Sequence, residues 1–275
     1  MSWQRVLVIS SCLAMSGASA VQAQLRPLEP LDPELWTGPK AQLQLGFGWL
    51  DEQRASLAGT TGDLFELGEA RALIRVDRVI LEFAGTPHRW FREHAVFAAP
   101  TGGARPAEDG RRHDSGDYRV VTAIRLAAAN ARVLPVLRFG TRLPTTNNRI
   151  GLERDALDFF ALVSAHHQPD RWSFDAEAGL ARNGTRLSNY EQSDVLAYAG
   201  TVSFRAGNLR PRVAVLGQKA FHDRVIRGNE DLGELRAGVR IGGARWIEVT
   251  FLHGYETFSP RFGILAAGGL KLDWN

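Results

Sequence analysis

The sequence predicts an all-β protein: a closed antiparallel transmembrane β-barrel of about 12 strands after a cleaved signal peptide. Three observations predict this fold. The chain opens with an export signal, it continues as segments of alternating apolar and polar residues, and the connections between these segments are alternately long and short. No run reaches the ~20 apolar residues that a membrane-spanning helix needs. We therefore expect a protein of the bacterial cell outer membrane in a Gram-negative organism.

Residues 1–23 have the features of a secretory signal peptide. Arg5 gives a positively charged start, residues 6–14 are largely apolar, and small residues then form cleavage motifs. The apolar run is too short to span a bilayer. Cleavage after Ala23 would remove the only cysteine, Cys12, so we expect a mature chain without disulfides or cysteine metal sites.

Residues 24–40 form a proline-rich leader. Proline has no backbone N–H and holds φ near one value, so a high density of proline disfavours a β-ladder. We expect an extended periplasmic leader into the barrel domain, residues 41–275. Its prolines are Pro27, Pro30, Pro33 and Pro39.

The barrel domain contains segments with period-two alternation. In the first, Leu43, Leu45 and Phe47 alternate with glutamine and glycine, which indicates a strand with two unlike faces. The segments are expected at residues 41–49, 69–76, 79–83, 118–126, 133–139, 157–164, 171–180, 196–205, 210–218, 234–241, 247–251 and 262–274.

The connections differ on the two sides of the predicted barrel. After odd-numbered segments they are long, at residues 50–62, 86–117, 141–155, 181–193, 219–231 and, shorter, 254–260. After even-numbered segments they are short, at residues 77–78, 127–132, 166–170, 206–208 and 242–244. Long loops on one rim, tight turns on the other and an even strand count are typical of outer-membrane barrels. The longest loop, residues 86–117, is the candidate for a constriction or cap.

The two faces of the strands are assigned to lipid and lumen. Arginine facing lipid at mid-bilayer costs about 2–4 kcal/mol, so charged residues are placed inside. The predicted lumen-lining residues are Glu69, Arg71, Arg75, Glu82, Arg125, Arg138, Asp158, Asp175, Glu177, Arg205, Arg212, Glu234, Arg236, Arg240, Glu248 and Lys271, and Arg119, Arg171 and Arg210 share their phase.

A lumen lined in this way allows two interpretations. It is an ion-lined pore that favours anions, with Arg138 and Arg240 helping to set ion preference, or it is closed by ion pairs that cross-brace a narrow barrel. Within the predicted strands, Pro135 and Pro211 predict bulges at the rim. Aromatic girdles are predicted from residues at or near strand ends, namely Trp49, Tyr118, Trp172, Phe204, Phe262 and Trp274.

One stretch resembles a known group of barrels. Residues 138–144 read Arg-Phe-Gly-Thr-Arg-Leu-Pro; Asn-Asn at 147–148, Gly-Leu at 151–152 and Asp-Phe-Phe at 158–160 follow. Over residues 134–165 this resembles the outer-membrane transporter barrels of the MetA-pathway of phenol degradation group. The resemblance implies a barrel that passes small aromatic or apolar compounds, without catalytic residues. The end of the chain departs from the usual aromatic terminus that the assembly machinery reads, because Asn275 follows Trp274.

We expect a channel or transporter for the passive passage of small molecules, without enzymatic activity, cofactor or metal. Its expected partners are outer-membrane lipid, a small-molecule solute and the barrel assembly machinery. Arginines spread along strands rather than gathered in a patch argue against nucleic acid. The alternatives are a closed, non-conducting scaffold barrel and an outer-membrane phospholipase-like enzyme.

Two histidine-containing motifs are expected to form neither a catalytic site nor a metal site. A phospholipase would use His113 and Ser115, which fall in the long loop rather than on a lipid-facing wall. His166 and His167 are expected in a solvated turn rather than at a metal, since neighbours on a strand point to opposite faces.

Overall fold

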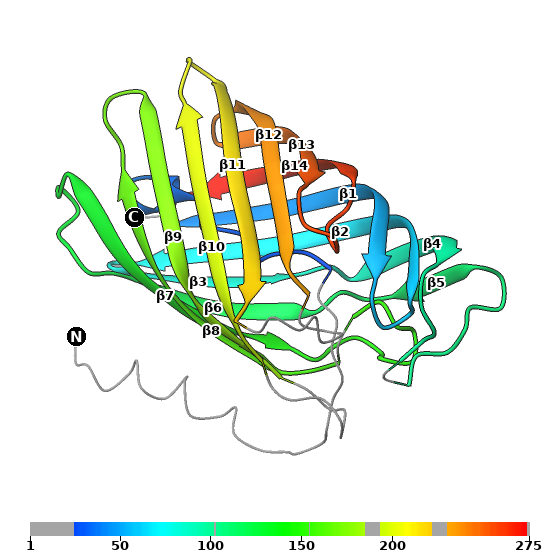
Figure 1. Cartoon of the computed structure of the whole chain (residues 1–275). Coiled ribbons are helices and arrows are strands. Elements are labelled where there is room, and N and C mark those ends of the chain that lie inside the picture. Colours follow the sequence, from blue (N-terminus) through cyan, green and yellow to red (C-terminus); the bar gives the residue numbers. More distant parts are fainter. Residues whose placement is uncertain (1–24, 102, 154, 185–192, 222–229, 274–275) are drawn as a thin grey trace.

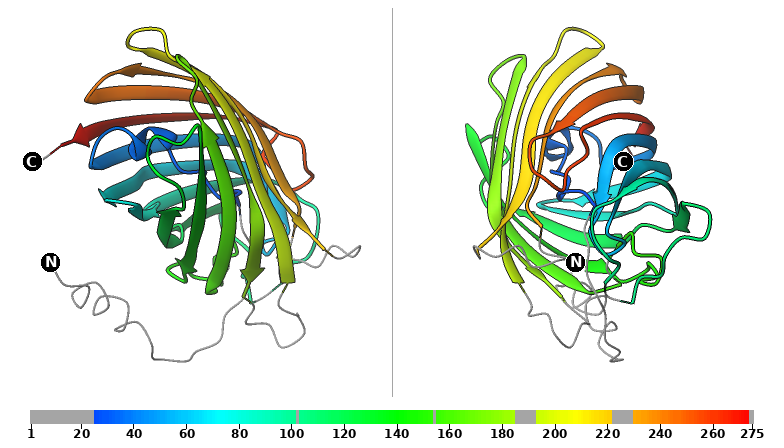
Figure 2. Two further views of the ribbon diagram at one scale, coloured as in Figure 1. Left: turned by 90° about the vertical axis from the view of Figure 1, so that its left-hand side faces the viewer. Right: turned by 45° about the vertical axis from the view of Figure 1, so that its right-hand side comes forward.

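The structure is a computed structural model that describes residues 25–101, 103–153, 155–184, 193–221 and 230–273. Its main feature is one antiparallel sheet that curves round and closes on itself (Figures 1 and 2). The predicted signal peptide, residues 1–23, lies outside the described residues.

The described elements are strands and one short 3₁₀ helix, η2 (Pro33–Trp36). No helix among the described residues is long and apolar enough to cross a membrane. The strands are β1 (Ala41–Ala55), β2 (Thr60–Val76), β3 (Val79–Gly85), β4 (His88–Val96), β5 (Arg111–Asp114), β6 (Tyr118–Arg125), β7 (Val133–Leu143), β8 (Asp158–His167), β9 (Trp172–Asn183), β10 (Ser193–Phe204), β11 (Leu209–Ala220), β12 (Leu232–Gly242), β13 (Arg245–Gly254) and β14 (Phe262–Leu272).

The wall of the barrel closes between its first and last strands. Of the 14 strands in the sheet, all except β4 and β5 form the ring, which leaves 12. Strand β1 pairs with β2 on one side and with β14 on the other, from Ala41 opposite Leu272 to Asp51 opposite Phe262. The prediction of a closed antiparallel barrel of this size is confirmed.

Two of the expected loops are largely strand. Residues 86–117 contain β4, which pairs with the first half of β2, and β5, which pairs with β4. The first connection shrinks to residues 56–59, because β1 extends to Ala55 and β2 begins at Thr60. These strands extend past the segments with alternating lipid and lumen faces, so the sequence there carries no period-two signal.

A β-bulge at Gly68 bends the wall. Gly46 of β1 lies opposite Glu69 and the next residue lies opposite Leu67, so Gly68 is the extra residue, with φ of 74°. This left-handed conformation favours glycine, and a Cβ atom there would lie 3.1 Å from Cγ of Pro87. The extra residue shifts the alternation of inward and outward side chains along β2 by one position.

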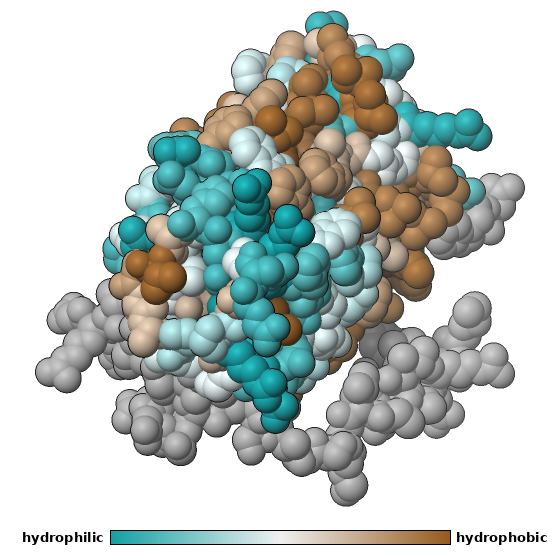
Figure 3. Space-filling model, turned by 90° about the vertical axis from the view of Figure 1, so that its right-hand side faces the viewer, coloured by the Kyte–Doolittle hydropathy of each residue, from teal (hydrophilic) through white to brown (hydrophobic). Residues whose placement is uncertain are grey.

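The outer surface of the wall carries exposed apolar side chains in the predicted phase. Leu45 is 65% exposed and Phe251 is 51% exposed, as expected for side chains that face lipid rather than a core. Aromatic residues gather near the turn end, where Trp172 packs against Phe174 and Phe204. In Figure 3, seen from the side of β4 and β5, hydrophilic residues occupy the centre and hydrophobic residues lie along the upper flank.

The predicted bulges at the two strand prolines are wrong. Pro135 lies opposite Ala165 and Pro211 lies opposite Val239, both in regular register. The ladder of β7 with β6, and that of β11 with β10, extends only to the residue after each proline. A missing N–H at such a position removes little pairing, so the prolines need no bulge.

Candidate functional site

The wall turns its charged residues toward the interior. Predicted lumen residues such as Arg138, Glu234 and Arg236 are almost completely buried inside the closed ring. Arg205 lies at the turn-end rim, with its side chain 49% exposed. Arg171 is exposed in the turn before β9 rather than in the lumen, because that strand begins only at Trp172.

The proline-rich segment, described from residue 25, occupies the interior instead of forming a periplasmic leader (Figure 2). At the loop end Leu25 packs in a cluster with Leu50, and at the turn end Leu35 packs in a cluster with Leu73. Residues 25–32 precede the 3₁₀ helix η2, and eight residues reach at most about 26–29 Å, close to the thickness of the bilayer's hydrocarbon core. We call residues 25–39 the inner segment.

Apolar residues of the wall also face inward where the inner segment has leucines. Leu28 packs with Val121, Phe160 and Leu162, whereas the sequence analysis assigned apolar side chains to the lipid face. Burying a leucine side chain contributes about 1.5–3 kcal/mol, so these contacts stabilise the position of the inner segment. The lumen surface is therefore a mixture of charged positions and apolar patches that match the segment.

The backbone of the inner segment is held by arginines of the wall. Arg138 Nη2 donates to the carbonyl oxygen of Glu29 at 2.6 Å, and Arg71 Nη2 donates to that of Pro30 at 2.9 Å. Near the turn end, Arg75 Nη1 donates to the carbonyl oxygen of Trp36 at 2.7 Å. These bonds satisfy carbonyl groups that a ladder would otherwise satisfy, which suits a chain rich in proline.

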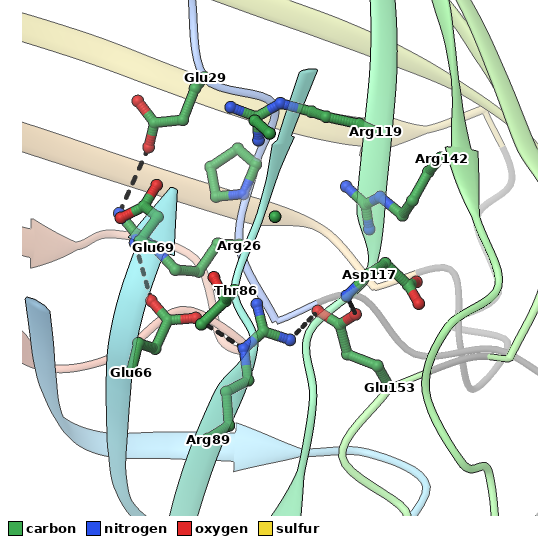
Figure 4. Close-up of a pocket in the computed structure, with 13 residues that line it drawn as sticks. Arg26, Glu29, Glu66, Glu69, Thr86, Arg89, Asp117, Arg119, Arg142 and Glu153 are labelled. Atoms are coloured by element: carbon green, nitrogen blue, oxygen red, sulfur yellow. Dashed lines mark hydrogen bonds and ion pairs between the residues drawn. The ribbon is translucent and has the colours of Figure 1, made fainter. Parts of the chain in front are cut away.

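Near the loop end, Arg26 of the inner segment lies among carboxylates (Figure 4). Its guanidinium contacts Glu66 at 3.1 Å, Glu234 at 3.4 Å and Glu29 at 3.4 Å. Glu69 lines the same cavity. Glu66 and Glu69 are three residues apart and would face opposite sides of a regular strand, so the Gly68 bulge brings both carboxylates to Arg26.

A second arginine links this cluster to the loops. Arg89 of β4 contacts Glu66 at 2.8 Å and Glu153 at 2.7 Å, joining the wall to the β7–β8 loop (Figure 4). Glu153 in turn accepts a 3.4 Å hydrogen bond from the backbone N–H of Asp117. Burial, followed by the negative charge of Glu153, raises the pKa of Asp117 well above its usual value.

In the middle of the barrel, Glu82 is the centre of a network within the wall. It contacts Arg71 at 3.0 Å, Arg119 at 3.1 Å and Arg138 at 3.9 Å, while Arg138 also contacts Glu177 at 2.8 Å. Arg138 is 0% exposed, so it braces the wall and the inner segment and has no contact with a solute in this state. This arrangement matches the cross-braced interpretation of the lumen.

Toward the turn end, the inner segment supplies carboxylates and the wall supplies cationic side chains. Asp32 pairs with Arg240. The carboxylate of Glu34 contacts Arg210 at 2.5 Å, Lys271 at 2.5 Å and Arg205 at 3.2 Å. The polarity of the contacts is thus the reverse of that around Arg26.

Little space remains between the inner segment and the wall. Two cavities there have volumes of about 50 Å³ each, and a third has about 20 Å³. A water molecule occupies about 30 Å³ of liquid, so such cavities hold at most a few waters. The described interior is closed to solutes in this conformation.

The prediction of a solvated turn is wrong for both histidines, which are the last two residues of strand β8. His166 is 4% exposed, and its Nδ1 lies 2.6 Å from Oδ1 of Asp175, directly opposite on β9. His167 points the other way and contacts the carbonyl oxygen of Arg132 at 2.7 Å. The cross-strand carboxylate escaped the sequence analysis because it lies nine positions along the chain. Among the described residues, no group of three or more His, Cys, Asp or Glu could hold a metal ion.

The arrangement of His113 and Ser115 does not resemble a catalytic pair. The Ser115 hydroxyl donates to the carbonyl oxygen of Thr145 at 2.8 Å, so its proton points away from a base. His113 is exposed on β5, with its ring 6.3 Å from that of His88. A nucleophile needs a base within hydrogen-bond reach, which this geometry does not provide.

Comparison with solved structures finds outer-membrane barrels. The COG4313 outer membrane channel from Pseudomonas putida F1 is similar with a TM-score of 0.57 and 12% identity, over 88% of this chain and 99% of that one. The β-domain of the Bordetella autotransporter BrkA has a TM-score of 0.45 and 12% identity, over 84% of this chain and 99% of its own. No family model and no curated protein matches the chain, so the resemblance to the phenol-degradation group is not confirmed. The fold is that of bacterial outer-membrane barrels.

Several residues of the interior network were missed by the sequence analysis. Glu66 and Arg89 lie where a bulge and a short strand interrupt the alternation; the glycine at 68 was the available signal for the bulge. Arg26, Asp32 and Glu34 lie in the leader, where proline content predicts an extended chain but not its location. Charges placed between prolines at intervals of two or three residues were the only indication that this chain has ionic partners.

Proposed function

We propose that the protein is a passive outer-membrane channel for small polar molecules, with the inner segment closing its pathway. One observation carries this proposal: the element that fills the charged interior is not part of the wall. The wall closes through the ladder of β1 with β14, and the inner segment belongs to no strand of the sheet and continues into the wall at β1. It can therefore leave the lumen without breaking a ladder.

The charged groups of the lumen bear on which class of solute could pass through it. The resemblance to the phenol-degradation group implies aromatic or apolar solutes, but the described lumen carries arginines and carboxylates along its length. Moving an apolar molecule past such groups would strip them of water without replacing their hydrogen bonds. We therefore favour polar solutes. Lipid and the barrel assembly machinery remain its proposed partners, and we propose no enzymatic activity.

A scaffold barrel is the second candidate, and the filled interior is the observation that favours it. Ion pairs that hold the inner segment at both ends of the lumen would suit a permanently closed protein. Such a barrel would display its loops or turns to partners and conduct nothing. The two candidates differ in whether removal of the inner segment opens a path.

Deletion of residues 25–36 tests the channel. The channel proposal predicts that the deletion variant produces stepwise conductance in planar bilayers, whereas the full chain remains mostly closed. In a second variant the same residues are replaced by a glycine–serine chain of equal length. This variant tests the proposal even if the deletion variant does not assemble. Folding of both is checked by the heat-modifiable shift of barrels on gels. Folded variants that conduct no more than the full chain would favour the scaffold.

A further inference from the structure

A pocket opens at the turn end of the barrel, between the inner segment and the turns of the wall. Its volume is about 360 Å³, several times that of the cavities deeper in the lumen. Small-molecule sites typically have volumes of about 300–1,000 Å³. The inner segment contributes Glu34, Thr37, Gly38 and Pro39 to its lining, and turns and strand ends of the wall contribute the rest.

The lining of this pocket is strongly basic. Arg205, Arg210, Arg240 and Lys271 give four positive charges against one negative charge from Glu34, which leaves a net charge of +3. Asp32 and Glu248, which both pair with Arg240 but do not line the pocket, reduce the excess to +1. These cations come from β11, β12, β14 and the turn after β10, so the closed barrel brings them together from distant parts of the chain.

The cations already hold a carboxylate. Oε1 of Glu34 is contacted by Arg210 and Arg205, and Oε2 is contacted by Lys271. Charge-assisted donors that converge on both oxygens of one carboxylate form a cradle that a free carboxylate would fit equally well. Glu34 reaches it from the inner segment and not from the wall.

We propose that this pocket binds a small organic anion bearing carboxylate groups, and that Glu34 is the resident carboxylate which this anion displaces. This proposal deepens the proposed channel function, on which its role in transport rests. Arg205 is 49% exposed and Thr37 and Gly38 are exposed, so the pocket is accessible from the turn end. Displacement of Glu34 removes an anchor of the inner segment, which couples binding of the anion to opening of the lumen.

Calorimetric titration of the full mature chain in phospholipid-free micelles tests the site. The probe is succinate, with neutral succinamide as its uncharged isostere and inorganic phosphate as an anion of different shape. Succinate is expected to bind and succinamide is not. In Glu34→Gln the competing charge is gone, and the affinity for succinate is expected to rise about tenfold.

Arg205→Ala in the Glu34→Gln background is expected to weaken succinate binding about tenfold, because one of the cationic donors to the displaced carboxylate is lost. Arg171→Ala is the matched control: Arg171 is also exposed near the turn end but does not line the pocket. Unchanged succinate affinity in Glu34→Gln would overturn the displacement, and equal affinity for phosphate would overturn the assignment of a carboxylate ligand.

This measurement does not depend on conductance. Succinate binding with no conductance after deletion of the inner segment would support the site and reject the channel. Conductance without succinate binding would reject the site and leave the channel intact.

Discussion

The two ends of the lumen hold the inner segment in opposite ways. At the loop end the segment carries the cation, Arg26, and the wall supplies the carboxylates of Glu66 and Glu234. At the turn end the segment carries the carboxylate, Glu34, and the wall supplies the cations. Apolar clusters hold the segment at both ends, around Leu25 and around Leu35, but the turn end opens into a pocket of about 360 Å³ whereas the cavity at the loop end has about 50 Å³.

This difference shows how the direction of the segment is encoded. A reversed segment would bring Glu34 to the wall carboxylates and Arg26 to the wall arginines, and like charges in a site of low dielectric repel strongly. It also indicates which end moves first. The loop end has room for at most a few waters beside Arg26, whereas the turn end opens into the larger pocket, so the segment is expected to loosen from the turn end.

The largest expected effect is that of Arg26→Glu. The variant places a carboxylate among Glu66, Glu69 and Glu234 and removes the charge that compensates them. Breaking a buried ionic cluster in this way costs about 3–5 kcal/mol of the free energy of unfolding. The measurement is the urea midpoint of the folded, heat-modifiable band, together with conductance, which is expected to rise as the segment leaves.

Glu34→Gln is the matched control for this change at the other end of the segment. Its partners Arg205, Lys271 and Arg210 are 49%, 17% and 12% exposed, so water can replace part of the lost interaction, chiefly at Arg205. A smaller loss of unfolding free energy than in Arg26→Glu is expected. Equal losses would show that the two ends hold the segment equally tightly.

A second prediction concerns the pH dependence of stability, which involves the pair of carboxyl groups of Asp117 and Glu153 at the loop end. Burial and the charge of Glu153 raise the pKa of Asp117 above its usual value of 3.8. The folded state therefore retains a proton that the unfolded state has already released, so stability falls as pH rises from this value through the folded pKa. In Asp117→Asn that fall is expected to be smaller.

Urea unfolding measured across this pH range, for Asp117→Asn beside the unmodified chain, checks the prediction. The control is Asp170→Asn near the turn end, where the carboxylate is exposed and asparagine tolerates the φ of 50° found at residue 170. The same pH profile in Asp117→Asn and in the unmodified chain would show that the Asp117–Glu153 pair does not make the loop end sensitive to pH.

The wall could be predicted from the sequence because lipid imposes a strict constraint. Every second residue of a spanning strand meets acyl chains, so the alternation at Leu43, Leu45 and Phe47 identifies a strand and assigns its faces. The same constraint placed Arg138 and Arg240 on the inner side. Strands β4 and β5 lie past the lipid, so this constraint does not act on them. The sequence therefore predicted a loop where these two strands lie.

The inner segment could not be located from the sequence because its partners are distant along the chain. Glu34 and Lys271 are separated by 237 positions, and only closure of the barrel brings them together. Local patterns report what a residue does within its own strand or turn. The prolines of the leader indicated an extended chain, while its destination depended on complementary charges that no local pattern relates.

The smallest expected effect is that of Arg205→Ala on stability. Arg205 contacts Glu34 at 3.2 Å with a half-exposed side chain, while Arg210 and Lys271 continue to hold the same carboxylate. Exposed ion pairs contribute about 0–1 kcal/mol and weaken in salt, so we expect a loss of unfolding free energy below about 1 kcal/mol that shrinks as ionic strength rises. Urea unfolding at low and high salt measures both. A loss as large as that of Arg26→Glu would mean that the turn end is also tightly sealed, and the segment would then have no weaker end from which to leave.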